Sequence, residues 1–483
     1  MNLKKTIPFT ITPLRLILLL TLMQLVVALF TNSLTFTHEE SMWHYIGRNW
    51  LRHGLVPYAG GVDNKSPLIY FIFGLSDRLF GINYWFPRLL GSVVEAAGVY
   101  YLFRIAKHIA GYRAGIFAIS VYGLSLLWKT TGGKLVSFTE TYACTAVIIS
   151  FYYCLSAEKN KHYFISGLFA GIALAFRLTS FFGILAILLV LIRRKLPATG
   201  AFIAGGAIAL GVLFAAMLLA GINMELMIHN MLTDNFGSGS TTDHSWAWKM
   251  DIFSSNFFDS EFVLFYPFVI GYLFFERKIN WLVAWLICTF IGINVLGIYA
   301  RPHFKELLPS LSLMSAFALA HLTETYKISY KGLLVVVWIC FFPKLLEPFW
   351  GLKKTIRPVP PVAACTPDLL QSDEAGEKQL GKWVKENTKE TDQVFVAGYG
   401  ARVQVYSERL SPTIYFNVTQ TSEAKNQLYK DLEANKPAMM IVPAFSNYKK
   451  FVGSDIRDFI EKVIARDYVW ERCLYGYGIY RLK

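Results

Sequence analysis

The chain has 483 residues, of which 54% are hydrophobic and 16% aromatic, while only 17% are charged. This composition, with a mean hydropathy of +0.40, excludes an ordinary soluble protein and indicates a polytopic membrane protein. The formal net charge of +14 does not indicate nucleic-acid binding, because many Lys and Arg residues stand in short clusters between apolar segments, where the positive-inside rule places them.

The first apolar segment covers residues 16–30 and follows Lys4, Lys5 and Arg15. No small-x-small cleavage site comes after it. We therefore predict a retained transmembrane helix with a cytoplasmic N-terminus rather than a signal peptide.

A polar stretch at 36–73 follows this first span, inside a predicted outer loop at 31–85. It combines two adjacent carboxylates, three histidines, two arginines and a lysine with Trp and Tyr residues. Charge this dense at the mouth of a membrane span is typical of a functional site. The alternative interpretation is a solvated loop with an amphipathic helix resting on the membrane surface.

Further apolar segments alternate with basic clusters up to residue 350. With roughly twenty apolar residues per span, we predict about eleven transmembrane helices. An odd number places the C-terminus outside, and the basic clusters all fall on the cytoplasmic side. After residues 16–30, the expected spans are 86–106, 114–128, 138–155, 164–176, 181–192, 202–220, 262–275, 281–298, 307–322 and 333–349, with a long polar loop at 223–260.

The composition changes after residue 350. Residues 351–365 are basic and rich in proline, as a linker would be, and residues 366–483 alternate between helix and strand patterns. This alternation predicts a small soluble α/β domain outside the membrane. Its expected elements are helices at 369–387, 422–435 and 456–466, strands at 394–399, 413–416 and 438–442, and a hairpin at 468–473 and 477–482.

Cysteine spacing does not indicate a metal site. Cys365 and Cys473 would both lie outside the membrane, where an oxidising compartment allows a disulfide between the linker and the last hairpin. Two free thiols are the alternative.

The outer loop resembles that of the polyprenyl-phosphate-sugar glycosyltransferases of the membrane-embedded C-type fold. The matching pieces are the acidic pair Glu39 and Glu40, Y-I-G at 45–47, G-L-V-P-Y at 54–58 and D-N-K-S-P-L at 63–68. This group includes bacterial relatives of protein O-mannosyltransferases, lipid A aminoarabinose transferases and lipopolysaccharide-core galacturonosyltransferases. The chain departs from the pattern where Glu39 replaces the usual Asp and where Ser66 replaces the first of two prolines.

The resemblance implies a polytopic α-helical enzyme of the bacterial inner membrane with a C-terminal α/β domain outside. Such an enzyme transfers a monosaccharide from a polyprenyl-phosphate donor, held among the membrane lipids, to a lipid A, glycan, lipid or protein acceptor. The acidic position of the family falls on Glu39, which the resemblance implies is the base, with Glu40 as the second choice. A surface Glu that caps the following helix is the alternative for either residue.

Cations must hold the phosphate as it leaves. The resemblance places Lys65 in this role, and the alternative is an interfacial lysine that reaches lipid headgroups. Arg48 and Arg52 are spaced four apart, on one helical face, and could assist. Glu140, near the outer end of the span at 138–155, is expected to orient the acceptor or to pair with a cation.

A later outer segment, R-P-H-F-K-E-L-L-P at 301–309, also resembles the family pattern. The resemblance carries His303 over as a residue that faces the lipid phosphate, and Arg301 and Lys305 are alternatives. We predict no cofactor and no metal, because the loop lacks the His-Glu-x-x-His spacing of a zinc site. The rival functions are a transporter or flippase of lipid-linked glycans, and a membrane subunit without catalytic activity.

Overall fold

The structure is a computed structural model of the chain. The residues it describes are 12–30, 34–128, 135–192, 196–233, 245–276, 280–297, 299–342, 374–417, 422–444 and 454–483. The predicted linker at 351–365, which includes Cys365, lies outside these ranges.

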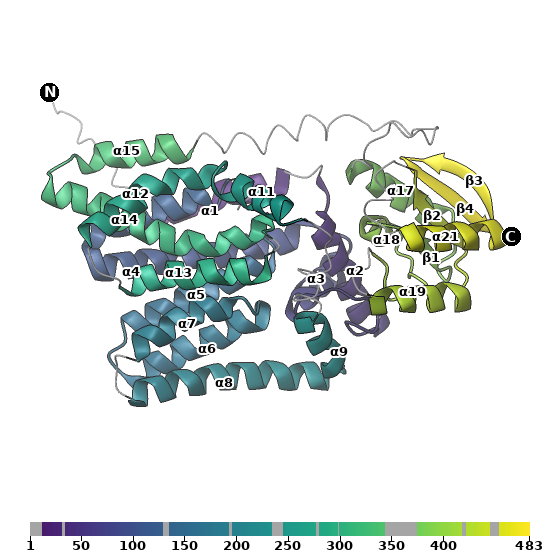
Figure 1. The fold of residues 1–483 in the computed structure, drawn as a ribbon, viewed down its shortest axis with the longest axis horizontal. Helices are drawn as coiled ribbons and strands as arrows, with labels where there is room; N and C mark the ends of the chain where they lie inside the picture. The colour runs from purple at the N-terminus through teal and green to yellow at the C-terminus, as the bar shows by residue number, and fades with distance from the viewer. Residues whose placement is uncertain are drawn as a thin grey trace, which may run out of the picture.

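Long apolar helices form the larger part of the molecule and lie side by side with similar axis directions (Figure 1). Each coincides with a segment that the sequence predicts as a span. They are α1 (Pro13–Phe30), α4 (Trp85–Ser125), α5 (Thr139–Leu155), α6 (Asn160–Phe176), α7 (Ser180–Leu191), α8 (Leu196–Leu219), α12 (Tyr266–Phe275), α13 (Trp281–Leu296), α14 (Leu308–Thr325) and α15 (Tyr330–Phe341).

Three helices among the described residues are long and apolar enough to cross a membrane alone, namely α1, α4 and α8. The bent pair Trp246–Phe257 and Glu261–Phe275, with 53° between its parts, raises the number to four if it counts as one span. The helices α7, α13 and α15 are apolar but shorter. The total of about eleven spans therefore stays a prediction.

The element α4 contains two of the predicted spans. Its helical backbone is interrupted at Ala110 and at Gly111, whose φ of 81° belongs to the left-handed region that glycine adopts at little cost. The break falls between the predicted spans 86–106 and 114–128. It separates two helical parts where the basic residues Lys107 and Arg113 stand.

The polar stretch forms two helices, α2 (His38–His53) and α3 (Pro67–Phe80). Thr37 and Glu40 form a complete capping box at the start of α2, and Ser66 with Pro67 begins α3. The helices cross at Gly47 and Gly74, where a Cβ on Gly47 would lie 2.2 Å from the Tyr70 carbonyl oxygen. The glycines thus let the two backbones touch.

Residues 374–483 form a four-stranded sheet with the order β1-β2-β4-β3. Strand β1 (Val394–Val396) pairs in parallel with β2 (Met439–Pro443), while β2 pairs antiparallel with β4 (Tyr477–Leu482), and β4 with β3 (Tyr468–Leu474). The helices of this region are α17 (Glu374–Glu386), α18 (Ala401–Ser407), α19 (Ser422–Ala434) and α21 (Ser454–Asp467). The expected strand at 413–416 is absent, and α18 was not predicted.

Cys473 on β3 is disulfide-bonded. Because Cys365 lies outside the described residues, the pairing of these two cysteines stays a prediction.

The helix α18 of the C-terminal region contacts α2 of the polar stretch. The polar stretch lies between the C-terminal region and the long helices (Figure 1). Arg402 donates from Nε to the Phe36 carbonyl at 3.1 Å and forms an ion pair with Glu377. Tyr406 and Thr35 share a buried hydroxyl hydrogen bond of 2.8 Å. These contacts hold the residues that lead into α2.

Replacing Arg402 by Met is expected to loosen the start of α2, because the Phe36 carbonyl loses its donor and Glu377 its ion-pair partner. Amide hydrogen exchange at residues 34–53 should become faster. The matched control is Arg409→Met, since Arg409 is equally buried but donates only to Thr388 and the Lys385 carbonyl, inside the C-terminal region. Equal exchange at 34–53 in both variants would contradict the prediction.

Candidate active site

Glu40, in the first turn of α2, is fully buried and accepts four hydrogen bonds. Arg88 donates from Nε to Oε1 at 2.9 Å and from Nη2 to Oε2 at 2.6 Å. Ser137 Oγ donates to Oε1 at 2.6 Å, and the backbone N–H of Thr37 donates to Oε2 at 2.7 Å. A bidentate guanidinium holds the carboxylate in one orientation, so we infer that Glu40 fixes the start of α2.

Arg88 also connects the start of α2 to the first span. Its Nη1 donates to the Ala28 carbonyl and its Nη2 to the Thr35 carbonyl, both at 2.9 Å. The side chain is fully buried. Arg88 therefore does not face lipid at the mouth of the second span.

Glu39, the neighbouring carboxylate, is exposed. It precedes Trp43 by four residues and so shares its face of α2. The Trp43 indole donates to Asp63 Oδ2 at 3.0 Å, and its ring lies 4.9 Å from that of Phe138. This face of α2 therefore looks toward the segment that carries Lys65 and toward the start of α5.

Lys65 is held by its backbone. The hydroxyl groups of Tyr58 and Tyr70 donate to its carbonyl at 2.6 and 3.0 Å, and its own N–H donates to Tyr70 at 3.2 Å. The ammonium group donates to Asn64 Oδ1 at 3.0 Å. The backbone is thus fixed by buried phenols, while the ammonium group keeps hydrogens for a further acceptor.

Lys65 lines a cavity of about 290 Å³ together with residues of α6, α7 and the loop between them. The cavity is mostly apolar, and its polar lining comes from a few side chains, as is typical of small-molecule sites. Those polar residues are Asn64, Lys65, Ser66, Thr139, Arg177 and Thr179.

Arg177 lies between two buried carboxylates. Its Nη1 donates to Glu140 Oε1 at 2.6 Å and its Nε to Glu306 Oε1 at 2.5 Å. No hydrogen bond from Nη2 to any described residue occurs. The carboxylates therefore orient the guanidinium while one of its edges remains for a ligand in the cavity.

His303 completes this cluster but carries no charge at neutral pH. Burial, followed by the positive charge of Arg177, lowers the pKa of the imidazole to about 3, although Glu140 opposes the shift. Its Nδ1 is buried without a partner among the described residues. His303 can therefore serve a phosphate only through a neutral hydrogen bond.

Comparison with known proteins points to one fold. Residues 64–221 match the family described as dolichyl-phosphate-mannose-protein mannosyltransferase. The chain superposes on ArnT from Cupriavidus metallidurans bound to undecaprenyl phosphate with a TM-score of 0.63 and 12% identity, over 97% of each chain. The chain has the C-type glycosyltransferase fold.

Other solved structures agree. Apo ArnT gives a TM-score of 0.66 at 10% identity, over 97% of both chains. The Archaeoglobus fulgidus oligosaccharyltransferase in complex with zinc and sulfate gives 0.54 at 10% identity, over 95% of this chain and 73% of that one. No curated protein matches the chain in sequence. The predicted resemblance to membrane glycosyltransferases of the C-type fold is confirmed.

Three of the predicted cations lie elsewhere in this C-type fold, and none of them lines the cavity. Arg48 donates to the Val405 carbonyl at 2.9 Å, and Arg52 forms an ion pair with Asp77 of α3. Arg301 is exposed and donates to Asn256 at 3.4 Å. This placement favours packing roles for Arg48 and Arg52 over contact with a phosphate.

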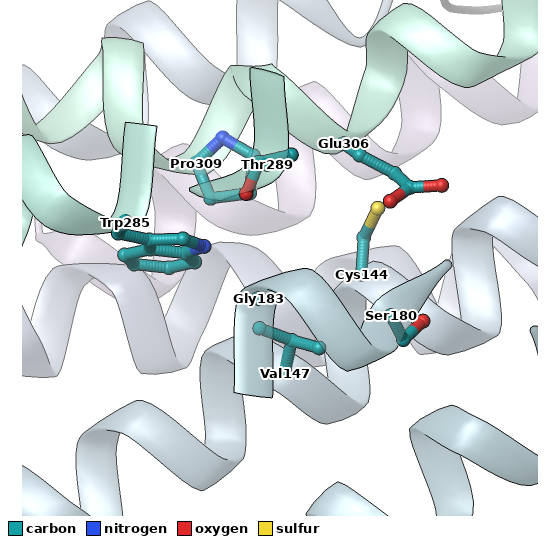
Figure 2. Close-up of a pocket in the computed structure, with 8 residues that line it drawn as sticks. All are labelled: Cys144, Val147, Ser180, Gly183, Trp285, Thr289, Glu306 and Pro309. Carbon is teal, nitrogen blue, oxygen red and sulfur yellow. The ribbon is translucent and has the colours of Figure 1, made fainter. Parts of the chain in front are cut away.

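A second cavity of about 20 Å³ is lined by Glu306, one of the two carboxylates that hold Arg177 (Figure 2). Cys144, Thr289 and Trp285 also line it, and the Thr289 hydroxyl is buried without a partner among the described residues. This volume suits one water molecule and is far too small for a sugar phosphate. The larger cavity is therefore the candidate donor site.

The described residues contain no group of three or more His, Cys, Asp or Glu side chains that could hold a metal ion. The prediction of no metal and no cofactor remains untested.

The sequence analysis assigned no role to Arg177 and Glu306, which belong to the cavity cluster. Arg177 stands next to an apolar segment, as many surface cations do, so the only available signal was a charge at the edge of a span. Lys305, an alternative for the phosphate contact, instead forms a buried ion pair with Glu95 of α4.

Proposed function

We propose that the chain transfers a monosaccharide from a polyprenyl-phosphate donor to an acceptor on the outer side of the membrane. The observation that carries this proposal is the cavity lined by both Lys65 and Arg177. Two cations suit a phosphate group, and the apolar lining suits the sugar and the first part of the lipid chain. ArnT, which shares the fold, has been solved with undecaprenyl phosphate bound.

The reaction needs one base and one stabilised leaving group. Glu39 removes the proton from the acceptor hydroxyl or amine as its oxygen or nitrogen attacks the anomeric carbon. The bond from that carbon to the phosphate oxygen breaks, and its electron pair stays on the phosphate. Lys65 and Arg177 stabilise the charge that develops there, and a single displacement of this kind inverts the anomeric centre.

Glu39 suits the base better than the other candidate acids. Glu40 is saturated by four donors, and Glu140 is paired with Arg177. Glu39 is exposed, and no hydrogen bond to another described residue occupies its carboxylate. We assign Glu140 to the orientation of Arg177.

The proposal includes a location. About eleven spans, with a cytoplasmic N-terminus, place the polar stretch and the C-terminal α/β region outside the bacterial inner membrane. The acceptor is then a glycan, lipid or protein of the cell envelope.

The test is an assay of the purified chain with undecaprenyl phosphate that carries a radiolabelled hexose or pentose, and with a cell-envelope extract as acceptor. A transferase moves the label to the extract and releases free undecaprenyl phosphate. A transporter or flippase leaves the donor intact. Intact donor with every sugar tried would overturn the proposal.

A further inference from the structure

An aromatic side chain of the C-terminal region lies beside the candidate base. Tyr399 follows β1 in the turn that leads to α18, where Gly398 has a φ of 74°. Its side chain is 40% exposed. The turn stands at the carboxyl end of a strand in a parallel pair, which is where open α/β sheets bind ligands.

Tyr399 packs against the first turn of α2. Its ring lies 4.5 Å from the ring of His38, centre to centre, with 88° between the planes. The amide of Asn417 lies 3.2 Å from His38 Nε2. The negative charge of Glu39, the next residue, adds to the effect of burial in raising the pKa of Tyr399. Tyr399 therefore packs on His38, the residue that precedes Glu39 in the first turn of α2.

The arrangement is rigid because α18 begins two residues after Tyr399. Arg402 ties this helix to the Phe36 carbonyl at 3.1 Å, and Arg48 of α2 donates to the Val405 carbonyl at 2.9 Å. Both arginines are buried. A ring held on a docked helix can define one wall of a binding site.

The first turn of α2, which carries Glu39, therefore lies between two parts of the molecule. The Trp43 face of α2 looks toward the Lys65 cavity, while Tyr399 flanks the first turn from the C-terminal region. An in-line displacement brings the acceptor to the anomeric carbon from the side opposite the leaving phosphate.

We propose that Tyr399 forms a wall of the acceptor site and packs its exposed ring against a sugar that carries the nucleophilic group. This inference rests on the proposed transferase function and adds to it the acceptor subsite and its class. A tyrosine ring offers an apolar face for the carbon-bound hydrogens of a sugar, together with a hydroxyl for hydrogen bonding. Tyr399 is a specificity residue in this account, and Glu39 remains the base.

The test compares Tyr399→Ala with wild type, using the labelled donor that wild type consumes and a glycolipid extract of the cell envelope as acceptor. The apparent KM for the extract should rise by about tenfold, while the KM for the donor and the slow hydrolysis of the donor by water stay unchanged. Tyr399→Phe should keep most of the acceptor affinity. The matched control is Trp470→Ala, because Trp470 is 53% exposed on β3, at the opposite edge of the same sheet.

An unchanged KM for the extract in Tyr399→Ala would overturn the inference and leave the transferase function standing. Loss of donor hydrolysis as well would also overturn it, since the residue would then support the whole site. A wild type that labels envelope protein in a parallel assay but not the glycolipid extract would overturn the acceptor class. Failure of wild type to consume any donor would instead reject the proposed function.

Discussion

Replacing Glu39 by Gln is expected to slow sugar transfer by about 10²- to 10⁴-fold, because the amide cannot take the proton of the acceptor. The fold should not change. The side chain is exposed, and no hydrogen bond from its carboxylate to another described residue is lost. The measurement is the single-turnover rate at saturating donor, together with the thermal midpoint of unfolding.

Glu39→Asp is the matched control, since it keeps the carboxylate and restores the residue type usual at this position in the resembling family. It should retain much of the activity. A Gln variant that transfers sugar at the wild-type rate would show that another group is the base. Donor binding should be equal in all three proteins, because Glu39 does not line the phosphate cavity.

Arg88→Met is expected to destabilise the chain by about 3–5 kcal/mol. The change leaves the Glu40 carboxylate buried without its guanidinium partner and leaves the carbonyls of Ala28 and Thr35 without their donor. Thermal unfolding in detergent should show a much lower midpoint. The effect is large because all of these groups are removed from water.

Two further variants distinguish the loss of the buried ion pair from the effect of replacing any arginine. Arg466→Met removes an exposed arginine paired with Glu433 and should leave the midpoint unchanged. The double variant Arg88→Met, Glu40→Leu should recover part of the loss, because no unpaired charge remains buried. Arg88→Met and Arg466→Met with the same midpoint would contradict the role of Arg88 in fixing the start of α2.

Periodicity and spacing predicted most of the secondary structure. Apolar length located the helices of the membrane part, and alternation located β2 and the β3–β4 hairpin. The strand expected at 413–416 is absent because this segment bonds to the polar stretch instead of a ladder: Ser411 N–H donates to the Tyr45 hydroxyl, and the Ile414 carbonyl accepts from Val62 N–H. The short helix α18 escaped prediction because its seven residues have no apolar period of their own and are buried by docking on α2.

Candidate residues could be proposed from the sequence only where they belong to one segment. Glu39 and Lys65 stand in the same outer loop, so the motif of that loop indicated both residues. Arg177 and Glu306 are 129 positions apart, and only the fold brings them together. Charge alone also could not separate Arg48, which holds α18, from a cation that meets a ligand, since both kinds stand on polar helices. His303 does not line the cavity, and its burial lowers the pKa of the imidazole, so its contact with the phosphate stays a prediction.

The central claim is that Lys65 holds the phosphate of the lipid donor. The most direct test is the affinity of the purified chain for undecaprenyl phosphate, measured for wild type and Lys65→Met. The change removes an ammonium group whose one hydrogen bond within the described residues is to Asn64, so the fold should persist. Arg301→Met is the control, because it removes an exposed cation that does not line the cavity. We predict that Lys65→Met weakens binding by roughly tenfold to a hundredfold and that Arg301→Met leaves it unchanged; equal affinity in wild type and Lys65→Met would contradict the account.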